Sequence, residues 1–136
     1  MKRALTVVLV LVAFLAGGCG FTDDDVEDHV QGEYKRARSL DIAGGAVAYT
    51  SSKAPGPVEQ AITKKWKASD RLSDAQGVLL RYPQHVVSLG PNGSGTVIRV
   101  EPIGTAYNRY RDRVGNRWAW GPTGENEHGG GPGEGK

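Results

Sequence analysis

Three side chains near the start of the chain have a spacing that could bind a metal ion. Asp25, His29 and Glu33 follow one another at steps of four residues, so they would share one face of a helix. An imidazole and two carboxylates are ligands that divalent transition metals accept. No second histidine stands nearby in the sequence to complete the coordination shell. A solvated polar helix face is therefore the favoured interpretation, and we expect neither a metal nor another cofactor.

His85 is a candidate general base, because it opens a predicted strand and other polar side chains are available to it. Such a base needs a nucleophile and a group that orients it, and these could come from Ser88, Asp70 and Asp74. No nucleophile elbow or comparable motif surrounds these residues. A histidine at a strand edge is the favoured interpretation, and we expect that the protein is not an enzyme.

Arginine and aromatic side chains gather in the C-terminal part of the chain. Guanidinium groups recognise carboxylates and phosphates, and arginine beside aromatic residues is typical of binding surfaces. The alternative interpretation is a solvated cationic edge with buried aromatic side chains. We predict binding contacts at Tyr107, Arg109, Tyr110, Arg111, Arg113 and Trp118, within a wider cluster that includes Arg117 and Trp120.

The N-terminal segment has the three parts of an export signal. Lys2 and Arg3 precede an uncharged apolar run from Ala4 to Ala16, which is shorter than the roughly 20 residues that a membrane-spanning helix needs. The stretch Leu15-Ala16-Gly17-Gly18-Cys19 resembles the bacterial lipobox, although Ala16 stands where that motif usually has leucine. This resemblance implies transfer of a diacylglyceryl group to the Cys19 thiol and cleavage before Cys19.

Cys19 is the one cysteine of the sequence, so the monomer has no internal disulfide and no cysteine metal cluster. Two or more acyl chains, such as palmitate, hold a protein firmly on a bilayer. We therefore expect a secreted lipoprotein, anchored through Cys19 to the extracytoplasmic face of the cell membrane. The alternatives are an ordinary signal peptide and a membrane helix with an incidental cysteine.

Loss of residues 1–18 would balance the charge of the chain. The full sequence has 17 Lys and Arg against 15 Asp and Glu, and removal of Lys2 and Arg3 leaves 15 of each sign. A chain without net positive charge gives no reason to expect nucleic acid as a partner. Residues 121–136 are rich in glycine and contain nothing suited to a core, so we predict a disordered tail. One domain over residues 19–120 remains.

Local patterns within residues 19–120 predict an α+β fold. A capping box and an apolar stripe predict a helix over Asp23–Arg38. The connector Ser39–Gly45 has room for a short strand, and Ala46–Ser51 is β-prone. Proline at a helix start predicts a second helix over Pro57–Ala68, and Ser69–Gly77 reads as a polar loop.

Three strands are predicted next, as an antiparallel meander over Val78–Tyr82, His85–Leu89 and Thr96–Val100. Gly90–Gly95 contains an Asn-Gly turn signal and lacks the lysine of a phosphate-binding loop, so we predict a hairpin turn. Residues 103–120 are compatible with a short helix or a strand, and the apolar spacing favours the helix.

Several short motifs follow one another in a particular order, namely Val47-Ala48-Tyr49, Ala54-Pro55, Leu79-Leu80-Arg81-Tyr82-Pro83, Gly95 to Val100 and Tyr107-Asn108-Arg109-Tyr110. In this respect the chain is similar to small bacterial lipoproteins that carry the domain of unknown function 4247. The resemblance covers roughly Val26 to Tyr110, and the glycine-rich tail resembles the actinobacterial branch. The family has no established activity, so the resemblance implies a fold and a compartment and no catalytic residue.

These observations favour an interaction or binding module of the cell envelope, tethered to the bilayer through acylated Cys19. An envelope membrane protein, an anionic lipid and a wall polymer are the partners that the arginine and aromatic cluster would suit. A purely structural envelope component is the first alternative, and a small hydrolase or metal-dependent enzyme is the second.

Overall fold

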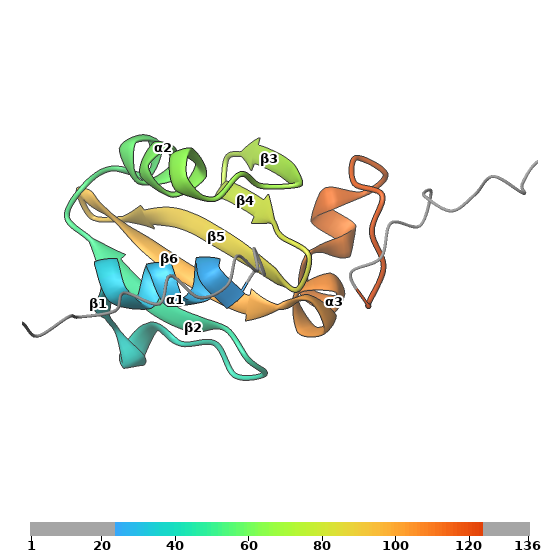
Figure 1. Ribbon diagram of the computed structural model, residues 1–136, viewed down its shortest axis with the longest axis horizontal. Helices are drawn as coiled ribbons and strands as arrows, with labels where there is room; N and C mark the ends of the chain where they lie inside the picture. The colour runs from blue at the N-terminus through green and yellow to red at the C-terminus, as the bar shows by residue number, and fades with distance from the viewer. Residues whose placement is uncertain (1–23, 124–136) are drawn as a thin grey trace, which may run out of the picture.

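A six-stranded antiparallel sheet runs through the part of the chain that the computed structural model describes, residues 24–123 (Figure 1). The strand order is β1-β2-β6-β5-β4-β3. The strands are β1 (Lys35–Arg36), β2 (Val47–Ser51), β3 (Asp70–Asp74), β4 (Gly77–Arg81), β5 (His85–Asn92) and β6 (Gly95–Pro102).

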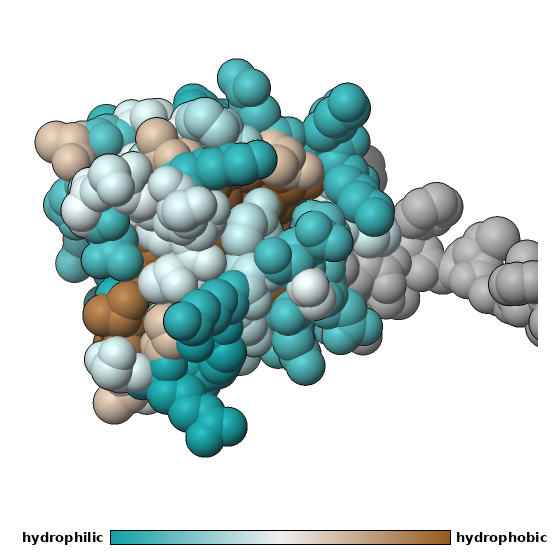
Figure 2. All heavy atoms as spheres, turned by 90° about the vertical axis from the view of Figure 1, so that its left-hand side faces the viewer, coloured by the Kyte–Doolittle hydropathy of each residue, from teal (hydrophilic) through white to brown (hydrophobic). Residues whose placement is uncertain are grey.

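Helices cover both faces of this sheet. They are α1 (Asp24–Glu33), α2 (Pro55–Lys65) and α3 (Ile103–Val114), with a short 3₁₀ helix, η1 (Arg38–Leu40), before β2. Side chains alternate between the two faces of a strand, so the sheet supplies two separate apolar surfaces. Helices α1 and α2 pack on one of them, while α3 and the segment that follows it pack on the other. Seen from the end that carries β1 and the β5–β6 turn, the molecule is mainly hydrophilic (Figure 2).

Each helix has an apolar side at the expected spacing. In α2 the buried residues are Val58 and Ile62, four positions apart, and the helix starts at Pro55, where a missing backbone N–H costs nothing. In α3 the buried residues recur at steps of three and four, as Ile103, Ala106, Tyr110 and Val114. These positions fall on one side of a helix, which is why α3 lies flat against the sheet.

The α+β class agrees with the sequence prediction, but the predicted three-stranded meander is wrong. The sheet has six strands because β2 pairs with β6, β1 pairs with β2, and the predicted loop Ser69–Gly77 contains β3. Only Leu72 of β3 is buried, so this edge strand has almost no apolar pattern. Its charged side chains instead bond to other elements, in the pairs Asp70–Arg81, Arg71–Glu59 and Asp74–Arg113.

The first helix ends at Glu33, earlier than the predicted Arg38. Gly32 lowers helix propensity near this end by roughly 1 kcal/mol, and the next residues pair with β2 instead. There Arg36 makes two hydrogen bonds of 2.6 Å to the Asp41 carboxylate, which also accepts the Ala48 backbone N–H at 2.8 Å. These contacts and the pairing with β2 decide the boundary, while the predicted start at residue 23 lies outside the described residues.

The other predicted boundaries lie closer to the observed ones. The second helix spans Pro55–Lys65, a few residues earlier than predicted, and the connector before β2 forms η1 and a single bridge between Ile42 and Ala46. The predicted hairpin turn is present, with Gly93 at a φ of 61°. Residues 103–120, for which helix and strand were both considered, contain the helix α3.

Several predictions concern residues that the structure does not describe. They are the signal peptide over 1–18, the lipidation site Cys19 and all of the predicted tail after Thr123. Of that tail, residues 121–123 are described, and Gly121 is buried. Between residues 24 and 123, no helix has both the length and the hydropathy required to cross a bilayer.

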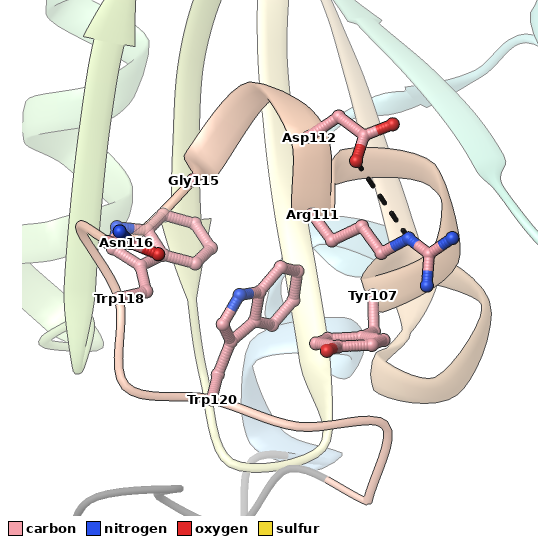
Figure 3. Close-up of a pocket in the computed structure, with 7 residues that line it drawn as sticks. All are labelled: Tyr107, Arg111, Asp112, Gly115, Asn116, Trp118 and Trp120. Atoms are coloured by element: carbon pink, nitrogen blue, oxygen red, sulfur yellow. Dashed lines mark ion pairs between the residues drawn. The ribbon is translucent and has the colours of Figure 1, made fainter.

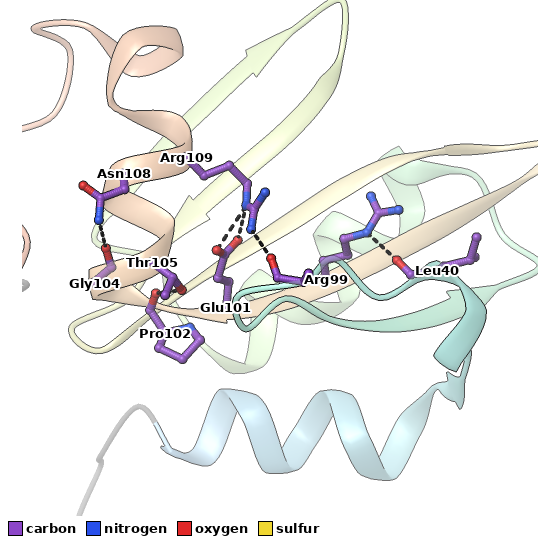
Figure 4. A network of polar contacts seen from close by, with 9 residues as sticks. Leu40, Arg99, Glu101, Pro102, Gly104, Thr105, Asn108 and Arg109 are labelled. Atoms are coloured by element: carbon purple, nitrogen blue, oxygen red, sulfur yellow. Dashed lines mark hydrogen bonds and ion pairs between the residues drawn. The ribbon is translucent and has the colours of Figure 1, made fainter.

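A buried ion pair fixes α3 on the sheet. The Glu101 side chain of β6 is only 1% exposed, and it accepts hydrogen bonds from Arg109 Nε at 2.9 and 3.1 Å (Figure 4). Arg109 Nη2 also donates to the Ala43 carbonyl at 3.3 Å. A carboxylate buried in this way is costly without a cationic partner, so the pair sets where α3 can lie.

We predict that Arg109→Met lowers the free energy of unfolding by about 3–5 kcal/mol, because it leaves the buried Glu101 carboxylate unpaired. Adding Glu101→Gln to that variant should recover part of the loss, since the remaining buried group is then neutral. Urea unfolding followed by circular dichroism measures both changes.

Arg111→Met is the matched control, because it makes the same substitution on the same helix at a side chain that is 58% exposed. It should change the free energy of unfolding by less than about 0.5 kcal/mol. Equal losses at Arg109 and Arg111 would show that the buried pair does not hold the helix.

Candidate functional site

The structure divides the predicted binding residues of α3 into two groups. Residues four positions apart lie on the same side of a helix. Tyr107 and Arg111 therefore face one way, and Arg109 and Arg113 face another. Each pair lines a different pocket, so the predicted cluster is two neighbouring surfaces rather than one.

The first surface, which we call the aromatic pocket, is a cavity of about 730 Å³ beside the C-terminal half of α3 (Figure 3). Tyr107 and Trp120 meet edge to face with ring centroids 5.0 Å apart, and Trp118 and Trp120 do so at 5.1 Å. Aromatic pairs favour this geometry. The remaining lining residues are Arg111, Asp112, Gly115 and Asn116.

The charged side chains of this pocket are available for contacts. Arg111 and Asp112 are 58% and 100% exposed, and their nearest charged atoms are 4.0 Å apart, so they bind each other weakly. Trp118 is only 4% exposed, and its indole N–H has no acceptor among the described residues. A buried donor without a partner lowers stability. The pocket thus combines aromatic side chains with an exposed cation.

The second surface, which we call the arginine pocket, is a cavity of about 480 Å³ between α3 and the sheet. Arg109, Tyr110 and Arg113 line it from α3, and Ser88 and Arg99 line it from β5 and β6. Ser88 and Arg99 are direct partners across these two strands, so they lie on the same face of the sheet. The pocket therefore brings three guanidinium groups from two elements together.

Two of these guanidinium groups are already bonded to carboxylates. Arg109 bonds to Glu101, as described above, and this hydrogen bond raises the pKa of Arg109. Arg113 makes hydrogen bonds of 2.7 and 2.6 Å to Asp74. These bonds, helped by the backbone N–H groups of Gln76 and Gly77, lower the pKa of Asp74 to about 2.

Of the three candidate metal ligands, His29 and Glu33 have described side chains, while the side chain of Asp25 lies outside the description. Among the described side chains, those of residues 26–123, no group of three or more His, Cys, Asp or Glu is placed to hold a metal ion. His29 is half-buried in α1, and burial lowers its pKa, with a further contribution from the positive charge of Lys65. Glu33, one turn further on, is exposed.

His85 is not assembled with the predicted catalytic partners. It lies on the α1 side of the sheet, where its Nε2 is 3.3 Å from a Glu27 carboxylate oxygen. Ser88, three residues further along β5, lies on the opposite face. Asp70 and Asp74 bond to Arg81 and Arg113, so neither carboxylate orients His85.

Sequence reasoning missed Asp112, Asn116, Arg99 and Ser88 as lining residues. Asp112 and Asn116 could have been found, because they fall inside the predicted cluster and are polar. Arg99 and Ser88 lie in two predicted strands, and nothing local connects them with the arginines that follow Pro102. Only the pairing of β5 with β6 and the position of α3 bring them together.

The fold and the two pockets define an α+β domain with one antiparallel sheet, covered by helices on both faces. The chain belongs to the family described as Domain of unknown function (DUF4247), whose profile matches residues 11–136. The resemblance stated above is confirmed at the level of the family. No curated protein and no solved structure matches the chain.

The Asp74–Arg113 pair predicts a pH dependence of stability. The pKa of Asp74 is lowered from 3.8 to about 2 in the folded protein. The contribution of Asp74 to the free energy of unfolding is therefore complete above pH 3.8, and it is lost as the pH falls through about 2. We expect wild-type protein to melt at a higher temperature than Asp74→Asn at pH 6, and this difference should disappear between about pH 4 and pH 2.

Arg113→Gln tests whether the bond to Arg113 is the cause, because this substitution should remove the same pH-dependent component of stability as Asp74→Asn. The double variant should lose no more of that component than either single variant. Thermal unfolding at a series of pH values measures it. A melting-temperature difference that stays constant down to pH 2 would contradict the prediction.

Proposed function

We propose that the chain is a lipid-anchored binding module of the cell envelope that contacts a partner protein through the aromatic pocket. The anchor is supported by the sequence of residues 2–19, with its basic start, its apolar run and a cysteine after two glycines. The glycine-rich residues 121–136 support an origin in the actinobacterial branch of the family.

An anchor at Cys19 would keep the domain beside the bilayer. Helix α1 begins at Asp24, five residues after Cys19, and five extended residues span at most about 18 Å. A protein held this close to the membrane meets membrane-bound partners at a raised effective concentration. The short connection therefore supports a function in contact with other envelope components.

The aromatic pocket lies on the other face of the sheet from α1. Helix α1, which follows the anchor, packs with α2 on one face, and the aromatic side chains pack with α3 on the other. The sheet thus separates the helix next to the anchor from the pocket. This arrangement supports a partner protein rather than the bilayer that carries the anchor.

The observation that carries the proposal is the composition of this pocket. Tyr, Trp and Arg are the side chains that most often dominate the energy of protein interfaces, and here Tyr107, Trp120 and Arg111 line one cavity. An acidic side chain of the partner would pair with Arg111.

Photo-crosslinking in native membranes tests the proposal. A photoreactive residue at Asn116, which is exposed and lines the pocket, should capture one envelope protein. The matched position is Gln60, an exposed residue of α2 on the other face, and it should not capture that protein. Cys19→Ser should abolish capture by releasing the domain from the membrane.

Charge reversal identifies the contact. Arg111→Glu should reduce capture about tenfold, as expected when an arginine that dominates an interface is lost. Lys64→Glu, the same charge reversal at an exposed residue of α2, should leave capture unchanged. Crosslinks to lipid or to wall polymer alone would contradict a protein partner, and equal capture from both positions would favour a structural envelope component.

A further inference from the structure

We propose that the arginine pocket is a second, separate binding site, which takes a phosphate group carried on a small organic molecule. This site uses different arginines from the aromatic pocket, although Asp112 lines both, and it does not depend on the proposed protein partner. Its volume of about 480 Å³ lies within the range of pockets that hold small ligands.

Arg99 is the arginine of this pocket whose charge an anion would balance. Its side chain is half-buried on the α3 side of β6, and its Nε donates to the Leu40 carbonyl at 2.9 Å (Figure 4). No carboxylate in the described part of the chain bonds to Arg99, in contrast to the other two arginines of the pocket. A partly buried cation without a counter-charge is unfavourable, and its two Nη groups form a fork that suits phosphate.

The other two arginines contribute donors that are held in position. The bonds from Arg109 to Glu101 and from Arg113 to Asp74 orient both guanidinium groups and neutralise their charges. Arg109 lines the cavity, and its Nη1 makes no hydrogen bond to the described residues, because the bonds from this side chain use Nε and Nη2. The pocket therefore offers fixed N–H donors around the one uncompensated charge of Arg99.

Ser88 and Gly90 form the part of the pocket that belongs to β5. Ser88 stands directly opposite Arg99, so its hydroxyl can donate to the same ligand oxygen atoms. Gly90, the next residue on this face, has no side chain and leaves space above the sheet. Phosphate offers more acceptor positions than a carboxylate, and this number of donors favours phosphate.

The pocket lining includes one carboxylate, Asp112, whose negative charge would repel a bound anion. Its side chain is fully exposed to water, and the nearest cationic group to it belongs to Arg111 at 4.0 Å. Water and salt screen an exposed charge strongly. The half-buried charge of Arg99 therefore dominates inside the cavity.

Calorimetric titration of the full chain in a neutral detergent tests the site, with glycerol 3-phosphate as the probe and chloride used to match ionic strength. We expect saturable binding of one molecule, competed by inorganic phosphate. Arg99→Gln should weaken it about tenfold, as expected for hydrogen bonds to a charged group. Arg99→Lys keeps the charge without the planar fork and should fall between the two.

Arg117→Gln is the matched control, because Arg117 is exposed and lines neither pocket. It should leave the affinity unchanged, while Ser88→Ala should weaken it with little effect on the fold. Absence of saturable binding to the wild type, equal losses at Arg99 and Arg117, or tighter binding of succinate than of glycerol 3-phosphate would overturn the proposal.

A second titration distinguishes a soluble phosphate ester from a phospholipid headgroup. The chain is placed in phospholipid nanodiscs instead of detergent, and the same probe is added. Unchanged affinity indicates a soluble ligand. Loss of probe binding in nanodiscs indicates that lipid phosphate occupies the pocket. In that case Arg99→Gln should bind neither the lipid nor the probe. Both results keep the phosphate site and are independent of the crosslinking at Asn116.

Discussion

The buried carboxylate of Glu101 is the constraint on which the second face of the sheet depends. It sits under α3 at 1% exposure, where only a cationic partner makes its burial tolerable. Arg109 provides that partner from the first half of α3. Once this contact is made, the direction of the helix across β6 is set. Arg113, one turn later, then meets Asp74 at the far edge of the sheet.

Both faces of the sheet are apolar, yet they are covered to different extents. Two helices, α1 and α2, cover one face, while α3 and the segment through Trp120 share the other. Because one helix is narrower than the sheet, hollows remain on both of its sides, and these are the two pockets. The aromatic pocket has the composition of a protein interface, whereas the arginine pocket has that of an anion site. A tethered module could use both at once.

The predicted cluster of arginine and aromatic residues is divided between the two pockets. The helix places Arg111 with Tyr107, and it places Arg109 and Arg113 with Arg99. A strand would have aligned all three arginines of this segment on one face. Two of those arginines also turn out to stabilise the fold through Glu101 and Asp74, so their residue type alone did not reveal their role.

Features that depend on local pattern can be predicted from the amino-acid sequence. The apolar stripes of the helices, the Asn-Gly turn, the unique Cys19 and the motifs of the family can all be recognised from neighbouring residues. The tertiary structure alone decided that the polar segment Asp70–Asp74 is a strand and that Lys35–Arg36 leaves the helix. It also decided that Arg99 joins the arginines of α3. The reason is physical: edge strands and ion pairs are stabilised by partners far away in the chain, and such partners leave no periodic signal in the segment itself.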